Sequence, residues 1–231
     1  MLCRAFVLAF LFGFLSAAPG YGANNNSVAS SPIRVACVGA SITKGVGAPK
    51  GKSYPDQLQQ ILGPGWYVRN FGVSGRTMLR KGDKPYWNEK AFQAAQDFQP
   101  NVVVIMLGTN DSKPVNWVHG DDFVSDYRDM VKVFQGLASK PQVYPCHPPV
   151  VVDPNKYKIS ESASAIMRQR IDALAKEMGL TVIPLDQSYA GDLSVLKDGV
   201  HPNEKGALEL AQTVAKALPA SAAPQPVHAA N

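Results

Sequence analysis

Cysteine and histidine are scarce in this chain, with three cysteines and four histidines among 231 residues. Neither Cys37 nor Cys146 has another cysteine or histidine at the spacing of a zinc site, so no structural zinc is expected. Each of the two ends an apolar run, and we expect the two runs to be strands that are not neighbours. We therefore predict two free, buried thiols. A disulfide is the alternative, because an exported protein can form one.

Strong charge is also missing, since charged residues make up 18% of the chain and the formal net charge is +5. The basic residues are scattered, apart from a mild cluster between Arg76 and Lys84. A nucleic-acid-binding protein would concentrate them on one strip with interleaved aromatic residues. We therefore expect no nucleic-acid partner and interpret the cluster as solvated surface. Weak attraction to anionic polymers or membranes is the alternative.

No apolar run is long enough to be a good membrane span, and no stable membrane insertion is expected. The longest stretch, Ala5–Leu15, follows Arg4 and precedes small residues, which is the pattern of a secretory signal. We predict a signal peptide over residues 1–22, cleaved after Ala18 or Gly22, and a secreted or periplasmic location. A retained N-terminal anchor is the alternative.

One domain is expected between residues 32 and 218, because roughly 190 residues build one core but not comfortably two. A polar linker over residues 23–31 would precede it. The Ala- and Pro-rich tail over residues 219–231 is expected to be disordered. No internal repeat is visible, and nothing in the sequence indicates an oligomeric state.

Short apolar runs alternate with amphipathic helical patterns inside this domain. The runs, typical of strands buried on both faces of a parallel sheet, are Ile33–Val38, Trp66–Asn70, Val102–Leu107, Gln142–Cys146 and Leu180–Ile183. The helical patterns are Ser53–Leu62, Asn88–Phe98, Asp121–Ala138, Ser160–Met178 and Asn203–Leu218. This alternation predicts right-handed crossovers and a three-layer α/β/α sandwich with a five-stranded, mainly parallel sheet.

Polar and small residues follow three of these runs and occupy the last loop. Ser41 comes after the first run, Gly72 after the second and Asn110 after the third, while Asp198 and His201 stand before the last helix. Ligands of an open parallel sheet bind beyond the carboxyl ends of its strands, so we expect these five residues to meet at one rim. A serine hydroxyl becomes a good nucleophile when a histidine takes its proton. An aspartate on the other ring nitrogen then holds the imidazole in the required tautomer.

The segments GASIT, NFGVSG, GTND and DGVHP resemble, in order, the sequence blocks of the SGNH (GDSL-type) serine hydrolase family, over about residues 33–218. The resemblance implies a flavodoxin-like fold with Ser41 as nucleophile and with Asp198 and His201 as its partners. It also implies an oxyanion hole made by the backbone N–H groups of Ser41 and Gly72 and the side-chain amide of Asn110. No cofactor and no metal is implied.

The stretches NFGVSGRTMLRKGDKPYWN and GTNDSKPVNW are similar to bacterial members of this family described as sialate or acetylxylan O-acetylesterases. The resemblance therefore implies a secreted esterase that removes small acyl groups, above all O-acetyl groups, from a small-molecule or polysaccharide ester through an acyl-enzyme. A lysophospholipase- or thioesterase-like lipid esterase is one alternative. An inactive carbohydrate-binding homologue is the other, because Ala40 stands where the family has Asp.

Other residues are expected near the rim without a fixed role. His147 is predicted as a rim residue, with a substrate contact as the alternative. His119 with Asp121 and Asp122 suggests helix capping by the acids more than a metal site. Aromatic faces that suit a sugar ring, or that simply anchor loops, are expected from Tyr86, Trp87, Trp117 and Tyr144.

Overall fold

The computed structural model describes residues 31–219. The predicted signal peptide, and nearly all of the predicted linker and tail, lie outside these residues. Within the described range, no helix has both the length and the apolar character needed to cross a bilayer.

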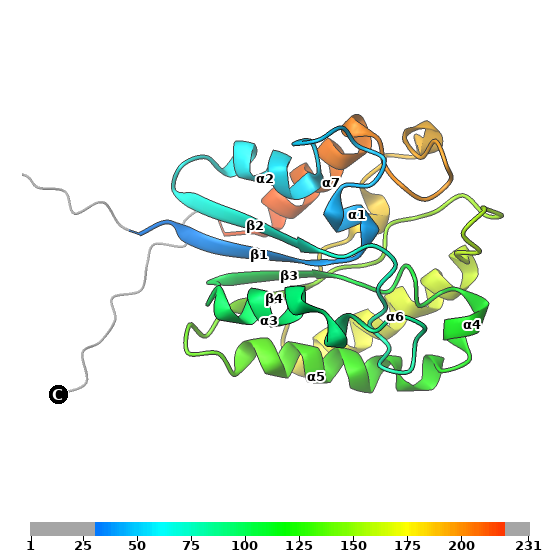
Figure 1. The fold of residues 1–231 in the computed structure, drawn as a ribbon, viewed down its shortest axis with the longest axis horizontal. Helices are drawn as coiled ribbons and strands as arrows, with labels where there is room; N and C mark the ends of the chain where they lie inside the picture. Colours follow the sequence, from blue (N-terminus) through cyan, green and yellow to red (C-terminus); the bar gives the residue numbers. More distant parts are fainter. Residues whose placement is uncertain (1–30, 220–231) are drawn as a thin grey trace, which may run out of the picture. The chain divides into compact units, whose positions relative to one another are not determined.

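Between residues 31 and 219, four parallel strands form one sheet in the order β2-β1-β3-β4. The strands are β1 (Ile33–Gly39), β2 (Trp66–Gly72), β3 (Val102–Met106) and β4 (Gln142–Pro145). β1 pairs with β2 up to Gly39 opposite Gly72, and with β3 up to Gly39 opposite Met106. The carboxyl ends of the three strands therefore lie level with one another, at the edge where α1 begins in Figure 1.

Helices cover both faces of this sheet, which gives the predicted three layers (Figure 1). One face carries α1 (Ser41–Lys44), α2 (Tyr54–Leu62) and α7 (Glu204–Ala217). The other carries α3 (Lys90–Asp97), α5 (Phe123–Gln135) and α6 (Glu161–Met178). Short turns of helix lie in the loops: α4 (Pro114–Trp117) and the 3₁₀ segments η1 (Tyr86–Asn88), η2 (Gly120–Asp122), η3 (Leu185–Gln187) and η4 (Leu193–Val195).

Polar caps begin the longer helices close to the predicted boundaries. Ser53 and Asp56 form a capping box at the start of α2, each accepting a hydrogen bond from the other's backbone N–H. The side chains of Ser160 and Asn203 cap α6 and α7 by accepting the N–H groups of Ala163 and Gly206. Each such cap is worth about 0.5–2 kcal/mol, which explains why local sequence sets these boundaries.

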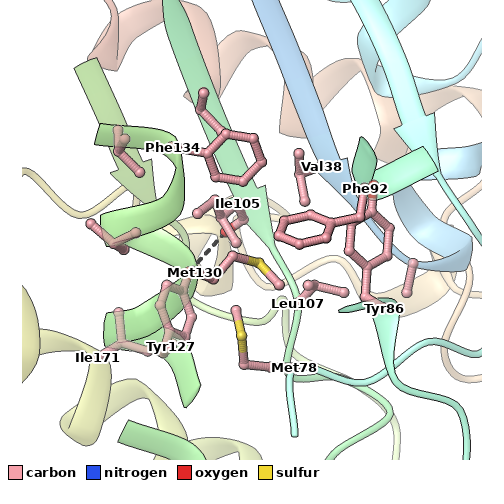
Figure 2. Close-up of a cluster of buried hydrophobic side chains, with 14 of the residues drawn as sticks. Val38, Met78, Tyr86, Phe92, Ile105, Leu107, Tyr127, Met130, Phe134 and Ile171 are labelled. Carbon is pink, nitrogen blue, oxygen red and sulfur yellow. Dashed lines mark hydrogen bonds between the residues drawn. The ribbon is translucent and has the colours of Figure 1, made fainter. Parts of the chain in front are cut away.

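Side chains alternate between the two faces of the sheet, and both faces are apolar. Val35 and Cys37 pack toward α2 and α7, whereas Val38 of the same strand packs toward α3, α5 and α6. Figure 2 shows this second layer, in which Tyr127 donates its hydroxyl to the carbonyl of Ile105 at 3.0 Å. Burial on both faces accounts for the unbroken apolar runs in the sequence.

Cys37 and Cys146 are free and buried, as predicted. Burial raises the pKa of Cys37 to about 12, against a smaller lowering by the nearby hydroxyl of Tyr54. At neutral pH the Cys37 thiol therefore stays protonated and behaves as a small apolar side chain.

The predicted fifth strand is reduced to a single bridge between Cys146 and Ile183. The N–H of Ile183 donates to the carbonyl of Pro145 at 2.9 Å, and the N–H of His147 donates to the carbonyl of Ile183 at 3.0 Å. A proline comes shortly after the bridged residue in each of the two segments. Proline has no N–H with which to continue the ladder of hydrogen bonds. The segment is thus parallel to β4, as expected, but too short to count as a strand.

Candidate active site

Ser41 is the first residue of α1 and stands directly beyond β1. The helix can begin there because two glycines leave room for it. A Cβ on Gly72 would lie 2.8 Å from the Cα atom of Lys44, and one on Gly39 would lie 2.9 Å from the Cβ atom of Thr43. Both distances are shorter than a Cβ atom tolerates, so only glycine lets α1 sit on the end of the sheet.

The predicted Asp198–His201 pair lies in a tight turn before α7. The Oδ1 atom of Asp198 accepts the N–H of Val200 at 3.0 Å and the N–H of His201 at 2.8 Å. Gly199, between them, adopts a φ of 82°, a conformation that glycine reaches without strain. The turn therefore holds the carboxylate by two backbone hydrogen bonds on one oxygen.

These bonds determine the charge of Asp198. Burial alone would raise the pKa of its carboxyl group. Hydrogen bonds from the backbone and ring of His201, from the N–H of Val200 and from the hydroxyl of Tyr157 outweigh this effect and hold the pKa well below its usual value. Asp198 is therefore a carboxylate that can only accept hydrogen bonds.

Ser41, His201 and Asp198 contact one another in series. The Nδ1 atom of His201 lies 2.8 Å from Oδ2 of Asp198, and its Nε2 atom lies 2.9 Å from Oγ of Ser41. Because Asp198 only accepts, Nδ1 must carry the proton, and Nε2 is left to accept the hydroxyl of Ser41. The structure thus brings the three predicted residues together in the geometry of nucleophile, base and orienting carboxylate.

The three predicted oxyanion donors are not equally free. The N–H of Ser41 opens α1, where a helix has no internal acceptor. The amide of Asn110 donates one hydrogen to the carbonyl of Arg76 at 3.1 Å and keeps a second. The N–H of Gly72, in contrast, donates to Oδ1 of Asn70 at 2.8 Å. In this structure Gly72 serves close packing and does not offer a free donor.

Asn110 is held in place by its neighbours in the loop after β3. Asp111 is fully buried and accepts the N–H groups of Met78 and Leu79 at 3.0 and 2.7 Å. Burial raises the pKa of Asp111 to about 6, although the two backbone donors oppose the rise. Asn116 donates to the carbonyl of Asn110 at 2.8 Å. The loops after β2 and β3 are therefore fastened to each other beside Ser41.

Ala40, where the resemblance leads one to expect Asp, does not displace the serine. Its methyl group is buried among apolar side chains. The segment is held instead by the N–H of Lys44, which donates to the carbonyl of Ala40 at 3.0 Å. The side chain of Asn70 also donates to the carbonyl of Thr43 at 2.7 Å. The position of Ser41 thus needs no carboxylate at residue 40.

Tyr157 also contacts the Asp198 turn, and no sequence pattern marked it. Its hydroxyl donates to Oδ2 of Asp198 at 2.9 Å, and its ring meets the His201 ring edge-on at 5.0 Å. Tyr157 lies in the loop between β4 and α6, 41 positions before Asp198. No motif or spacing relates the two residues, so only the folded chain reveals the contact.

Of the four aromatic residues expected near the rim, three pack within loops and one lies in a strand. Tyr86 is fully buried and donates its hydroxyl to a backbone carbonyl of β2 at 2.6 Å. Trp87 lies under an arginine guanidinium, 3.7 Å from its ring centroid. Tyr144 is buried in β4, and Trp117 packs edge-on against a phenylalanine of α5. None of these observations indicates an open face for a sugar ring.

The acids beside His119 behave differently from the expectation. Neither Asp121 nor Asp122 caps a helix through its side chain. Asp122 instead pairs with Lys81 at 2.8 Å, a contact that lowers the pKa of its carboxyl group. Across residues 31–219, no group of histidine, cysteine and acidic side chains is arranged to hold a metal ion.

His147 lies just beyond β4 between two carboxylates. Its Nδ1 atom is 2.8 Å from Asp186 and its Nε2 atom is 2.9 Å from Asp172. Only 11% of its side chain is exposed, so it links α6 to η3 and is not an open rim residue. Burial lowers the pKa of His147, but the two carboxylates outweigh burial and raise it above the ordinary value.

We expect this cluster to make folding stability depend on pH. The pKa of His147 is higher in the folded chain than its ordinary value of 6.5. The stabilisation is therefore fully present below that ordinary value and is lost as the pH rises through the folded value. His147→Gln should lower the free energy of unfolding by about 1 kcal/mol at acidic pH and by less at alkaline pH. Urea unfolding at both pH values measures the difference.

His119→Gln is the matched control, because the ring of His119 forms no hydrogen bond to any residue between 31 and 219. It should cost little at either pH. An equal loss for His147→Gln at both pH values would contradict the charge-based account.

Known proteins resemble this chain in sequence. The profile of the GDSL-like Lipase/Acylhydrolase family matches residues 37–208, from β1 into α7. An acetylxylan esterase from Xylanibacter ruminicola is 41% identical over 210 residues. That match covers 80% of this chain but 43% of the relative, so this chain spans less than half of that relative's length.

Solved structures share the fold. A carbohydrate acetylesterase from Sinorhizobium meliloti is 21% identical, with a TM-score of 0.67, covering 80% of this chain and 97% of that one. An inhibitor-bound aryl esterase from M. smegmatis is 21% identical, with a TM-score of 0.65, and the match again covers 80% of this chain and 97% of that one. These likenesses confirm the predicted fold class, and the family profile confirms the predicted resemblance. The chain belongs to the GDSL-like lipase and acylhydrolase family.

Proposed function

We propose that this protein is a serine esterase that removes small acyl groups, above all acetyl, from carbohydrates. The observation that carries the proposal is the unbroken series from Oγ of Ser41 through the His201 ring to Asp198, with contacts of 2.9 and 2.8 Å. A turn serine with no catalytic role would have no reason to meet a histidine whose tautomer is fixed in the reactive form.

In the proposed reaction, Oγ of Ser41 attacks the ester carbonyl while Nε2 of His201 takes its proton. The tetrahedral intermediate then collapses and the ester C–O bond breaks, while the protonated imidazole, stabilised by Asp198, gives this proton to the leaving sugar oxygen. An acyl-serine remains, and a water molecule activated by His201 releases the acid and restores the serine. No step needs a cofactor.

Charge on the ester oxygen develops as the tetrahedral intermediate forms. The free N–H of Ser41 and the second amide hydrogen of Asn110 are the proposed donors to this oxygen. The N–H of Gly72 could join only after releasing Asn70.

The substrate class rests on the relatives. The 41% identical protein is named an acetylxylan esterase, and one structural neighbour is named a carbohydrate acetylesterase. We propose the same chemistry here, acting on an O-acetylated glycan. The N-terminal pattern Arg4 followed by Ala5–Leu15 supports export, where such glycans are met.

A chain-length series tests the proposal. p-Nitrophenyl esters from acetate to laurate, together with acetylated xylan, are offered to the protein, and a fluorophosphonate probe is mapped by peptide mass spectrometry. We expect a sharp preference for acetate, release of acetate from the glycan, and labelling at Ser41. Preference for laurate would favour a lipid esterase instead. Absence of both hydrolysis and labelling would favour an inactive homologue and overturn the proposal.

A further inference from the structure

Tyr157 and His201 donate hydrogen bonds to the same oxygen of Asp198. Its hydroxyl donates to Oδ2 of Asp198 at 2.9 Å, and the Nδ1–H of His201 donates to the same atom at 2.8 Å. The other oxygen already accepts two backbone N–H groups of the turn. Each oxygen of the Asp198 carboxylate therefore accepts two hydrogen bonds, which is its full capacity. Among these four donors from residues 31–219, Tyr157 is the only one that donates a hydroxyl.

The loop that carries Tyr157 is built onto the Asp198 turn. The N–H of Val152 donates to the carbonyl of Gly199 at 2.8 Å, so loop and turn are joined through their backbones. Asn155 folds the loop over itself, accepting the N–H of Tyr157 at 3.1 Å and donating to the carbonyl of Ile159 at 2.8 Å. The tyrosine is therefore held at the carboxylate by its own loop.

A small apolar cluster strengthens this attachment. Val151 and Ile159 from the loop pack with Val200 from the turn, and Tyr157 packs against them. The cluster is separate from the two main layers of the core. The buried contact surface thus fixes the loop to the very residues that carry Asp198 and His201.

We propose that Tyr157 is a positioning residue: its hydroxyl fixes the Asp198 carboxylate and limits how strongly that carboxylate holds a proton on His201. The inference rests on the proposed function. A hydrogen bond from Tyr157 draws charge from Oδ2, so less charge remains to stabilise the imidazolium. The tyrosine ring, at 86° to the imidazole and 5.0 Å from it between centroids, also restricts rotation of the His201 ring.

Few other charges face this pair. Asp198 forms its only ion pair within the described chain with His201. Lys156, from the same loop as Tyr157, places its ammonium 5.0 Å from the centre of the tyrosine ring. Ser41 of α1 faces the far nitrogen of His201. Lys197, next to Asp198 in the chain, forms no ion pair with it. The hydroxyl of Tyr157 is therefore the group whose removal should change the pair most.

Tyr157→Phe removes the hydroxyl and keeps the ring. We expect kcat to fall about tenfold, because a carboxylate no longer held by the hydroxyl positions the imidazole less well against Ser41. We also expect the acidic limb of the kcat/KM–pH profile to move to higher pH, because the freed carboxylate stabilises protonated His201 better. The Nδ1–H proton of His201 should move downfield in the NMR spectrum.

The acidic limb of the kcat/KM–pH profile and the Nδ1–H resonance of His201 distinguish a positioning role from a purely structural one. A purely structural tyrosine would lower the rate and leave both in place, and that result, or movement in the reverse direction, would overturn the proposal. Fluorotyrosine at position 157, a stronger donor with nearly the same shape, should move both readouts the opposite way from phenylalanine and serves if Tyr157→Phe folds poorly. The NMR readout needs no substrate, so it stands even if the esterase proposal fails.

Tyr144→Phe is the matched control. It also loses a hydroxyl that donates to a side-chain oxygen, here that of Gln142 at 3.0 Å. Because the hydroxyl of Tyr144 bonds to Gln142 of the same strand and not to Asp198 or His201, the pH profile of the variant should match that of the unmodified protein.

Discussion

Ser41→Ala is expected to lower kcat by about 10⁴-fold or more, while leaving the fold intact. The Oγ atom of Ser41 contacts His201 and makes no other hydrogen bond in the described chain, so its loss removes the attacking atom and little else. The backbone N–H of residue 41 remains at the start of α1. In serine hydrolases, removing the nucleophile costs up to about 10⁶-fold, and binding with the oxyanion donors supplies what activity is left.

Steady-state hydrolysis of an aryl acetate measures this loss, and circular dichroism with thermal unfolding checks the fold. Ser188→Ala is the matched control, because its hydroxyl bonds to Thr213 of α7 and not to His201. A Ser41→Ala protein that keeps a tenth of the activity would exclude Ser41 as the nucleophile.

Local sequence was sufficient to predict the layers and most element boundaries. The apolar runs of β1 and β3 and the caps at Ser53, Ser160 and Asn203 act over a few residues, and short-range physics governs them. The Leu180–Ile183 run failed as a strand because pairing depends on a partner's N–H groups, and prolines remove them. This loss of pairing depends on two segments that lie far apart in the sequence, so neither segment alone reveals it.

Some contacts of the candidate active site could likewise be predicted from the sequence, and others could not. Ser41 follows β1, and Asp198 and His201 stand in the loop before α7, so their meeting at one rim of the sheet could be predicted from this order together with the family resemblance. The hydrogen bond that occupies the N–H of Gly72 comes from a side chain two residues away, whose rotamer no pattern specifies. Tyr157 reaches Asp198 from a loop 41 positions upstream, and its role depends on a fold of that loop built around Asn155. Contacts of this kind are absent from any local motif.

Asp198→Asn is expected to reduce kcat by roughly 10⁴-fold with little change in stability, for a reason particular to this turn. Oδ1 of Asp198 accepts the N–H groups of Val200 and His201, so the amide oxygen of asparagine must stay there. Its NH₂ group then takes the place of Oδ2 and donates to Nδ1 of His201. The imidazole is forced into the other tautomer, with a hydrogen on Nε2 pointing at Ser41, and cannot take the serine proton.

Asp198→Ala distinguishes the effect on the His201 tautomer from the effect on the turn, because it also loses both backbone hydrogen bonds to Oδ1. It should lower the free energy of unfolding by about 1–3 kcal/mol as well as the rate. Asp198→Asn should lower the rate alone, as kinetics and urea unfolding of the two variants will show. Since the three residues act as a unit, adding Asp198→Asn to Ser41→Ala should slow the reaction no further. A double variant that loses another thousandfold would mean that Asp198 acts on the substrate by itself and not through His201.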